Sequence, residues 1–149
     1  MSKILVSQCL LGCNCRYKGD NCQNHQIIAL SKDHTLIPIC PEQMGGLPTP
    51  RAPSEILGNK VISHQGQDVT EQYQTGASIA VYLAQLNHVD LAIMKSKSPS
   101  CGKGLIYDGS FSGKMIEGNG VTVDKLLNHG IDVYTEEELD EVLKRLHNQ

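Results

Sequence analysis

The stretch Ile4-Leu5-Val6-Ser7-Gln8-Cys9 is a short apolar run that ends in polar residues and a cysteine. A run of this length predicts a buried strand that opens into a loop. The pattern recurs at residues 36–39, which directly precede Cys40, and at 91–94, which precede a loop that contains Cys101. Three predicted strands therefore each lead toward a cysteine.

Helical patterns alternate with these runs, and a fourth apolar run follows the third helix. The expected helices span residues 23–30, 68–87, 122–128 and 135–146, and the fourth strand spans 131–134. Asp68 with Glu71, and Thr135 with Glu138, have the spacing of capping boxes at helix starts. The last helix has one apolar face, formed by Leu139, Val142, Leu143 and Leu146. Strands that alternate with helices predict a parallel sheet that is covered on both faces.

The other segments are expected to be loops, apart from one hairpin. Residues 55–63 contain two apolar runs around Gly58-Asn59, which is a hairpin signal. Residues 40–54 are rich in proline and glycine, and with 95–104 they are expected to form irregular loops. We find no internal repeat and no interdomain linker. The predicted fold class is therefore α/β, with a single three-layer domain over residues 1–149 and a mostly parallel, Rossmann-like sheet.

The composition argues against several classes of partner. The chain has 149 residues, 40% of them hydrophobic, and a formal net charge of −3. Its 13 basic residues against 16 acidic ones give no excess for binding phosphate backbones. One Phe and no Trp make a poor stacking platform for single strands. No window approaches the ~20 apolar residues of a membrane span. We therefore expect a cytoplasmic protein with neither a nucleic-acid nor a membrane partner.

Six cysteines are the unusual feature of this composition. In a reducing compartment they indicate metal binding or catalysis more than disulfides. Cys9, Cys40 and Cys101 each lie beyond the end of a predicted strand, and parallel sheets bind ligands at that edge. Three thiolates that converge there would form a soft-metal site for zinc or an iron–sulfur cluster. A cluster held by three thiolates would leave one iron open for chemistry.

Other polar residues receive less specific interpretations. We interpret Cys13, Cys15 and Cys22 as small, half-buried loop residues, with local metal chelation as the alternative. The six histidines show no ligand-like spacing with one another or with the cysteines. Arg16 and Arg51 could contact an anionic substrate group, but surface loop positions are the simpler interpretation.

Several motifs together resemble those of the DUF523 family, whose characterised members are thiouracil desulfidases. The likeness spans nearly the whole chain, and it is the combination of motifs that is specific. The matching motifs are Ser7-x-Cys9-Leu10-Leu11-Gly12, Cys15-Arg16-Tyr17-x-Gly19, Cys40-Pro41-Glu42-x-x-Gly45-Gly46-Leu47-Pro48-x-Pro50-Arg51, Lys95-Ser96-x-Ser98-Pro99-Ser100-Cys101-Gly102 and Tyr107-Asp108-Gly109-x-Phe111-Ser112-Gly113. Cys13 and Cys22 depart from the family's pattern.

The resemblance implies a [4Fe–4S] cluster and the removal of sulfur from 2-thiouracil or a related thiolated pyrimidine, which gives uracil and hydrogen sulfide. Carried over by position, Cys9, Cys40 and Cys101 would be the cluster ligands, and the substrate sulfur would bind the open iron. Glu42 and Ser98 would be the catalytic pair, with Glu42 activating water or moving a proton and Ser98 orienting that water or the ring.

Structural roles are the alternatives for both catalytic residues. Glu42 could cap its loop, Ser98 could form the turn before Pro99, and Ser100 competes with Ser98 for any role. Two other functions also stay open. One is a non-catalytic zinc or iron–sulfur module for structure or sensing, and the other is a thiol enzyme with Cys101 as nucleophile. The sequence does not determine the oligomeric state.

Overall fold

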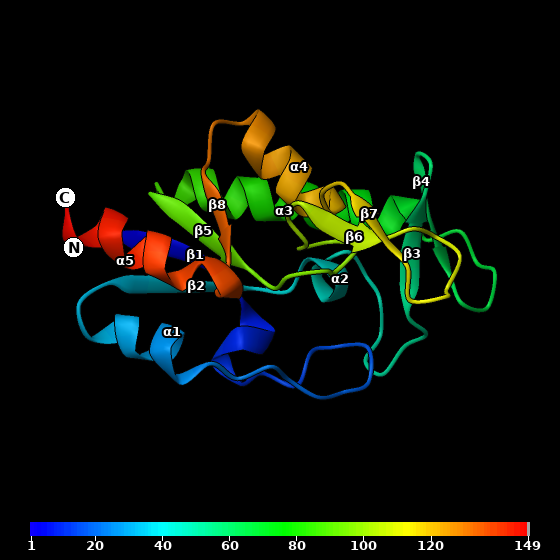
Figure 1. The fold of residues 1–149 in the computed structure, drawn as a ribbon, viewed down its shortest axis with the longest axis horizontal. Helices are drawn as coiled ribbons and strands as arrows, with labels where there is room; N and C mark the ends of the chain where they lie inside the picture. The colour runs from blue at the N-terminus through cyan, green and yellow to red at the C-terminus, as the bar shows by residue number, and fades with distance from the viewer. Residues whose placement is uncertain (149) are drawn as a thin grey trace.

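A four-stranded parallel sheet forms the centre of the molecule (Figure 1). The structure is a computed structural model that describes residues 1–148. In it, β1 (Lys3–Ser7) lies between β2 (Thr35–Ile39) and β5 (Leu91–Met94), and β8 (Val133–Thr135) pairs with β5. The order β2-β1-β5-β8 places β1 and β5 inside the sheet, where both faces are covered. This is why these two strands read as continuous apolar runs in the sequence.

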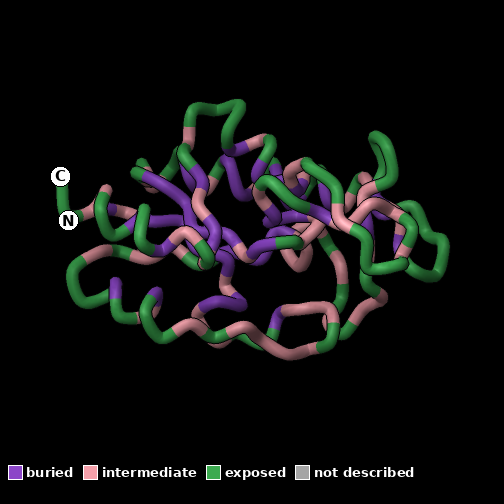
Figure 2. The backbone as a smooth tube through the Cα atoms, viewed as in Figure 1, coloured by how far each residue is buried: buried purple, intermediate pink, exposed green. Residues whose placement is uncertain are grey.

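Two helices cover each face of the sheet, which confirms the predicted α/β architecture. α1 (His25–Ala29) and α5 (Leu139–His147) pack on the face that presents Ile4, Val6 and Ile93. α3 (Thr70–Leu86) and α4 (Val121–Asn128) pack on the opposite face. Figure 2 shows that burial is concentrated in the strands and on the inner helix surfaces. None of the helices in the described part of the chain is long and apolar enough to cross a membrane.

Two hairpins lie at the end of the molecule opposite the chain termini (Figure 1). β3 (Ser54–Leu57) pairs with β4 (Lys60–Ser63), which confirms the hairpin predicted for residues 55–63. β6 (Leu105–Tyr107) pairs with β7 (Met115–Glu117). Three short 3₁₀ helices, η1 (Gln8–Leu11), η2 (Leu30–Lys32) and η3 (Glu136–Glu138), complete the elements. The hairpins therefore extend the molecule beyond the sheet.

Two elements lie where the sequence predicted only irregular chain. α2 (Pro41–Met44) is a single helical turn inside the expected loop 40–54, and it begins at proline, which suits the first helical position. The β6–β7 hairpin lies in a glycine-rich stretch that we expected to be a loop. Both elements are too short to produce a clear periodicity, so local patterns do not reveal them.

The predicted helix starts have different outcomes. The capping box of Thr135 and Glu138 is confirmed, although the turn that it begins is the 3₁₀ helix η3. The one predicted at Asp68 is wrong, because α3 starts after Val69 and the Asp68 carboxylate accepts a bond from the Thr70 N–H at 3.0 Å. Leu143 does not belong to the buried face of α5, since 44% of it is exposed.

Candidate active site

Three strand ends bring three cysteines to one cavity. Cys9 follows β1, Cys40 follows β2, and Cys101 lies in the loop after β5. These strands are parallel neighbours, so their carboxyl ends lie at the same edge of the sheet. All three residues line a cavity of about 380 Å³ at that edge. The structure therefore brings together the three thiols that the sequence analysis selected, as the topological rule for parallel sheets requires.

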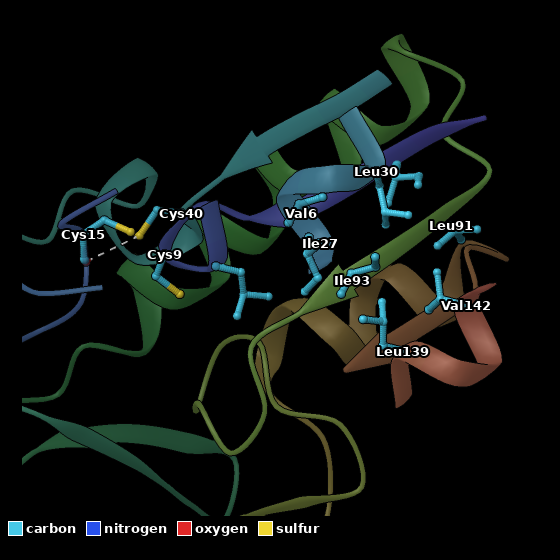
Figure 3. Close-up of a cluster of buried hydrophobic side chains, with 12 residues drawn as sticks. Val6, Cys9, Cys15, Ile27, Leu30, Cys40, Leu91, Ile93, Leu139 and Val142 are labelled. Atoms are coloured by element: carbon cyan, nitrogen blue, oxygen red, sulfur yellow. Dashed lines mark hydrogen bonds between the residues drawn. The ribbon is translucent and has the colours of Figure 1, made fainter. Parts of the chain in front are cut away.

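A fourth cysteine, Cys15, lines the same cavity, and its placement corrects the interpretation of a half-buried loop residue. Only 3% of Cys15 is exposed. The Cys40 thiol donates a hydrogen bond to the Cys15 carbonyl oxygen, at 3.8 Å from Sγ. Figure 3 shows Cys9, Cys15 and Cys40 grouped at one end of the apolar core. Gly12 ends η1 in the left-handed conformation (φ 97°), and this turn glycine three positions before Cys15 was the available sequence signal.

The Cys40 and Cys101 thiols of the cavity are protonated at neutral pH when no metal is bound. Burial raises the pKa of Cys101 to about 12, although a hydrogen bond with Ser7 lowers it. The hydrogen bond with Cys15 and burial also raise the pKa of Cys40. A metal that binds these thiolates must therefore displace protons. A nucleophilic cysteine needs a lowered pKa, so this environment argues against Cys101 as the nucleophile of a thiol enzyme.

The donor set suits an iron–sulfur cluster. Thiolates are the soft ligands that such clusters use, and the three strand-end cysteines all face one cavity. Among residues 1–148, no group of three His, Cys, Asp or Glu side chains is close enough to hold a single metal ion. The fit therefore rests on the chemistry of the donors and on the cavity that they share.

Glu42 lies in the first turn of α2, and two side chains hold its carboxylate in the cavity. The Tyr73 hydroxyl donates to Glu42 Oε1 at 2.8 Å, and Arg51 Nε donates to the same oxygen at 3.2 Å. Burial raises the pKa of Tyr73 well above its ordinary value, and the Glu42 charge raises it further, so the hydroxyl stays protonated as a donor. Since Arg51 belongs to the same loop 40–54, the Glu42 side chain also ties its own loop together, as the structural alternative predicts.

Close packing of α2 on α3 places Glu42 beside Tyr73. At Gly76 of α3 an added Cβ would lie 1.9 Å from the Pro41 carbonyl oxygen, and at Gly45 it would lie 1.9 Å from the Gln72 carbonyl oxygen. Only glycine permits this approach of the two backbones. The two glycines therefore set the distance between the helix that carries Glu42 and the helix that carries its hydrogen-bond partner.

Arg51 is a buried link between Glu42 and the cysteines, which corrects the prediction of a surface residue. Its side chain is 6% exposed. Besides Glu42, it donates through Nη2 to the Cys15 carbonyl oxygen at 2.9 Å. For Arg16 the predicted surface position fits better, because its side chain is partly exposed and pairs with Asp20 at 3.3 Å. The sequence analysis missed Tyr73 and misplaced Arg51 at the surface, because Tyr73 reaches Glu42 across 31 positions and Arg51 reaches Cys15 across 36.

The structure separates the roles of Ser98 and Ser100. Ser98 lines the cavity, and its Oγ accepts the N–H groups of Ser100 and Cys101, each at 3.0 Å. These two bonds occupy the acceptor sites of the hydroxyl, so its proton is available to donate. Ser100 is buried and shares a hydrogen bond with Thr122 at 2.9 Å. Ser98 therefore both shapes the Cys101 turn and offers a donor to the cavity.

The loop that carries Cys101 is anchored where it leaves the sheet. Glu136 accepts hydrogen bonds from the Ser96 N–H at 2.7 Å and the Ser96 hydroxyl at 2.9 Å. Its carboxylate also pairs with Lys95 Nζ at 3.1 Å. Burial raises the pKa of Glu136, but the Ser96 N–H and Lys95 outweigh it and hold that pKa below its ordinary value of 4.5.

We expect Glu136→Gln to lower the free energy of unfolding by about 1–3 kcal/mol at pH 7. The substitution removes the negative charge that strengthens the two hydrogen bonds from Ser96 and pairs with Lys95. A folded-state pKa below the unfolded value means that this stabilisation is complete above pH 4.5 and is lost as the pH falls through the folded-state pKa. Anaerobic urea unfolding of both proteins at neutral and acidic pH measures the difference. An equal difference at both pH values would show that the charge is not its source.

The far wall of the cavity comes from the hairpins. Pro53, Ser54 and Glu55 line it beside Tyr107 and Phe111. The sequence analysis matched Tyr107 and Phe111 to a motif but assigned them no role. The cavity therefore lies between the sheet edge, which supplies the thiols, and a wall that supplies aromatic rings and a carboxylate.

Comparisons with known proteins agree on one family. A family model described as 2-thiouracil desulfurase matches residues 4–138. An uncharacterised protein of Bacillus subtilis (strain 168), YbbK, is 41% identical in an alignment of 150 positions. The alignment covers 94% of this chain and 99% of that protein. A solved structure described as the [4Fe-4S]-dependent thiouracil desulfidase TudS (DUF523Vcz) is 40% identical and has a TM-score of 0.95, and the match covers 100% of both chains.

Proposed function

Because the chain belongs to the 2-thiouracil desulfurase family, we propose that it is a [4Fe-4S]-dependent thiouracil desulfidase, which converts 2-thiouracil and water to uracil and hydrogen sulfide. One observation carries the proposal. Cys9, Cys40 and Cys101 line one cavity together with Glu42 and Ser98, in a fold that matches that of an enzyme with this activity along its whole length.

We assign the cluster to Cys9, Cys40 and Cys101. These residues follow three adjacent parallel strands, and together they offer three thiolates on one side of the cavity. When bound there, a [4Fe–4S] cluster with three protein ligands supplies an iron with an open coordination position, which is a soft Lewis acid suited to a thiocarbonyl sulfur. Cys15 also lines the cavity beside these thiols, but we do not assign it as a cluster ligand.

Glu42 is the proton-transfer group of this proposal. Tyr73 and Arg51 both donate to its Oε1, and within the described residues its Oε2 has no hydrogen-bond partner. That oxygen can take a proton from the water that attacks the C=S carbon and can pass it to the pyrimidine ring. Arg51 compensates the carboxylate charge, and Tyr73 fixes its orientation.

Ser98 is the hydrogen-bond donor of this proposal. Since its oxygen already accepts two backbone N–H groups, its proton is directed to whatever lies in the cavity. There it orients the attacking water or the edge of the ring. The overall reaction replaces the C=S bond by a C=O bond and releases sulfide without a change in oxidation state.

The proposal treats residues 1–149 as one catalytic domain and the substrate as a small thiolated pyrimidine. That the protein acts without a nucleic-acid or membrane partner, and that it is cytoplasmic, stay predictions from composition. The acidic balance of the chain supports the first of these, because a phosphate backbone needs clustered basic residues.

Anaerobic purification followed by an activity assay tests the proposed function. We expect a brown protein with about four irons and four inorganic sulfides per chain, and equal release of uracil and sulfide from 2-thiouracil. The loaded protein without substrate, and the protein after chelation of its iron, serve as controls. A colourless protein that contains one zinc and releases no sulfide would contradict the assignment and favour the non-catalytic metal-binding module.

A further inference from the structure

Glu55 on β3 is a buried carboxylate that faces the cavity without a cation beside it. It is 9% exposed and lines the cavity. Its Oε1 accepts two backbone N–H groups of the β6–β7 loop, from Gly109 at 3.0 Å and from Phe111 at 3.1 Å. None of the ion pairs in the described part of the chain includes Glu55. One oxygen of this carboxylate is therefore occupied in holding the loop.

The second oxygen, Glu55 Oε2, is free to accept a hydrogen bond. No hydrogen bond reaches it from the described residues. No fully buried side-chain oxygen or nitrogen in residues 1–148 is left without a partner, so Oε2 is in contact with solvent. Because Glu55 lines the cavity, a molecule bound there meets a free acceptor.

Phe111 is held beside this acceptor in an uncommon backbone conformation. Its φ is 55°, in the left-handed region that residues other than glycine rarely adopt. The bond from its N–H to Glu55 holds it there. Its ring lies 4.9 Å from the ring of His64, at an interplanar angle of 44°, and it lines the cavity. Strain of this kind persists where the surrounding structure fixes it, often at ligand sites.

Close packing of the loop on β3 fixes both residues relative to each other. Gly109 has φ 94°, and a Cβ at this position would lie 2.9 Å from the Ile56 carbonyl oxygen. The loop backbone therefore rests directly on the strand that carries Glu55. The aromatic ring and the free carboxylate oxygen form a unit that is built before any ligand arrives.

We propose that Glu55 and Phe111 form the subsite that recognises the pyrimidine ring: Phe111 packs against the face of the ring, and Glu55 Oε2 accepts a ring N–H. This inference rests on the proposed function, because it concerns the substrate of that reaction. The thione form of 2-thiouracil has two ring N–H donors next to the C=S group and a flat π face. A carboxylate acceptor with an aromatic platform is complementary to both, and it makes the two residues determinants of specificity.

Matched variants separate the two contacts. Glu55→Gln keeps an oxygen that can accept the Gly109 and Phe111 N–H groups, and it replaces the free acceptor by an NH₂ donor. Phe111→Leu removes the ring and keeps an apolar side chain, while Phe111→Tyr keeps the ring and is the control. None of these changes touches a cysteine, so the iron content and the absorbance of the anaerobic holoenzyme should stay those of the wild type.

The measurements are the KM for 2-thiouracil and the Kd of the holoenzyme for uracil, which has the same ring N–H groups and needs no turnover. We expect Glu55→Gln and Phe111→Leu to raise both constants by roughly tenfold to a hundredfold, with a smaller change in kcat. Phe111→Tyr should stay within about threefold of the wild type. Unchanged constants in both Glu55→Gln and Phe111→Leu would overturn the proposal.

N-methylated substrates identify the hydrogen bond itself. Methylation of the ring nitrogen that faces Glu55 should weaken binding to the wild type and have little further effect in Glu55→Gln. An equal penalty in both proteins, for 1-methyl- and for 3-methyl-2-thiouracil, would show that Glu55 accepts no ring N–H.

Uracil binding also separates the subsite proposal from the proposed function. A wild type that binds uracil through these residues but releases no sulfide contradicts the proposed function alone, and normal turnover with unaffected variants contradicts the subsite alone.

Discussion

Replacement of Cys9, Cys40 or Cys101 by serine is expected to abolish sulfide release from 2-thiouracil and to reduce the iron content from about four per chain to less than about one. Serine is similar in size to cysteine, so each variant should fold, but a hydroxyl is a poor ligand for iron. The three residues follow three neighbouring strands, one of the three after each strand. Iron and sulfide analysis of anaerobically purified protein measures the effect, with circular dichroism as the check on folding.

The other cysteines are matched controls in the same chain. Cys13 is exposed and Cys22 is half-buried, so their serine variants should retain both iron and activity. Cys15 is the most stringent control, because it is buried, lines the same cavity and accepts a hydrogen bond from the Cys40 thiol at its carbonyl oxygen. We expect Cys15→Ala to keep its iron. A Cys15 variant that loses the cluster, together with a strand-end variant that retains it, would transfer the ligand assignment to Cys15.

Glu42→Gln is expected to lower kcat by about 10²–10⁴-fold, the usual contribution of a positioned proton-transfer group, while the iron content and cluster absorbance stay unchanged. Glutamine can still accept bonds from Tyr73 and Arg51 at its oxygen, so the side chain keeps its place and loses only its basicity. Steady-state kinetics with 2-thiouracil measure the effect. A kcat within about threefold of the wild type would remove Glu42 from the mechanism.

Tyr73→Phe is the control for the position of the carboxylate. It removes one of the two donors to Glu42 Oε1 and leaves Arg51 in place. One hydrogen bond is worth about 1 kcal/mol, so kcat should fall by only about fivefold. If Tyr73→Phe had as large an effect as Glu42→Gln, the hydroxyl itself, and not only the carboxylate, would take part in the reaction.

Much of the fold is predictable because the longer elements have clear local signals. β1 and β5 are apolar runs because both of their faces are covered, and α3 shows its buried stripe over several turns. The short elements α2 and β6–β7 have no such signal, and yet they carry Glu42 and hold Phe111. Elements of three or four residues depend on their neighbours for stability, so tertiary contacts decide them.

The features of the candidate site also fall into two groups, those that the sequence determines and those that only the tertiary structure decides. By itself, the sequence determined that Cys9, Cys40 and Cys101 follow strands, and parallel strands end at one edge of a sheet. Only the tertiary structure decided the order β2-β1-β5, which makes these three strands neighbours. It also decided which side chains serve the site, because Tyr73 reaches Glu42 across 31 positions and Arg51 reaches Cys15 across 36. The path of the folded chain creates such contacts, and no local pattern of residues encodes that path.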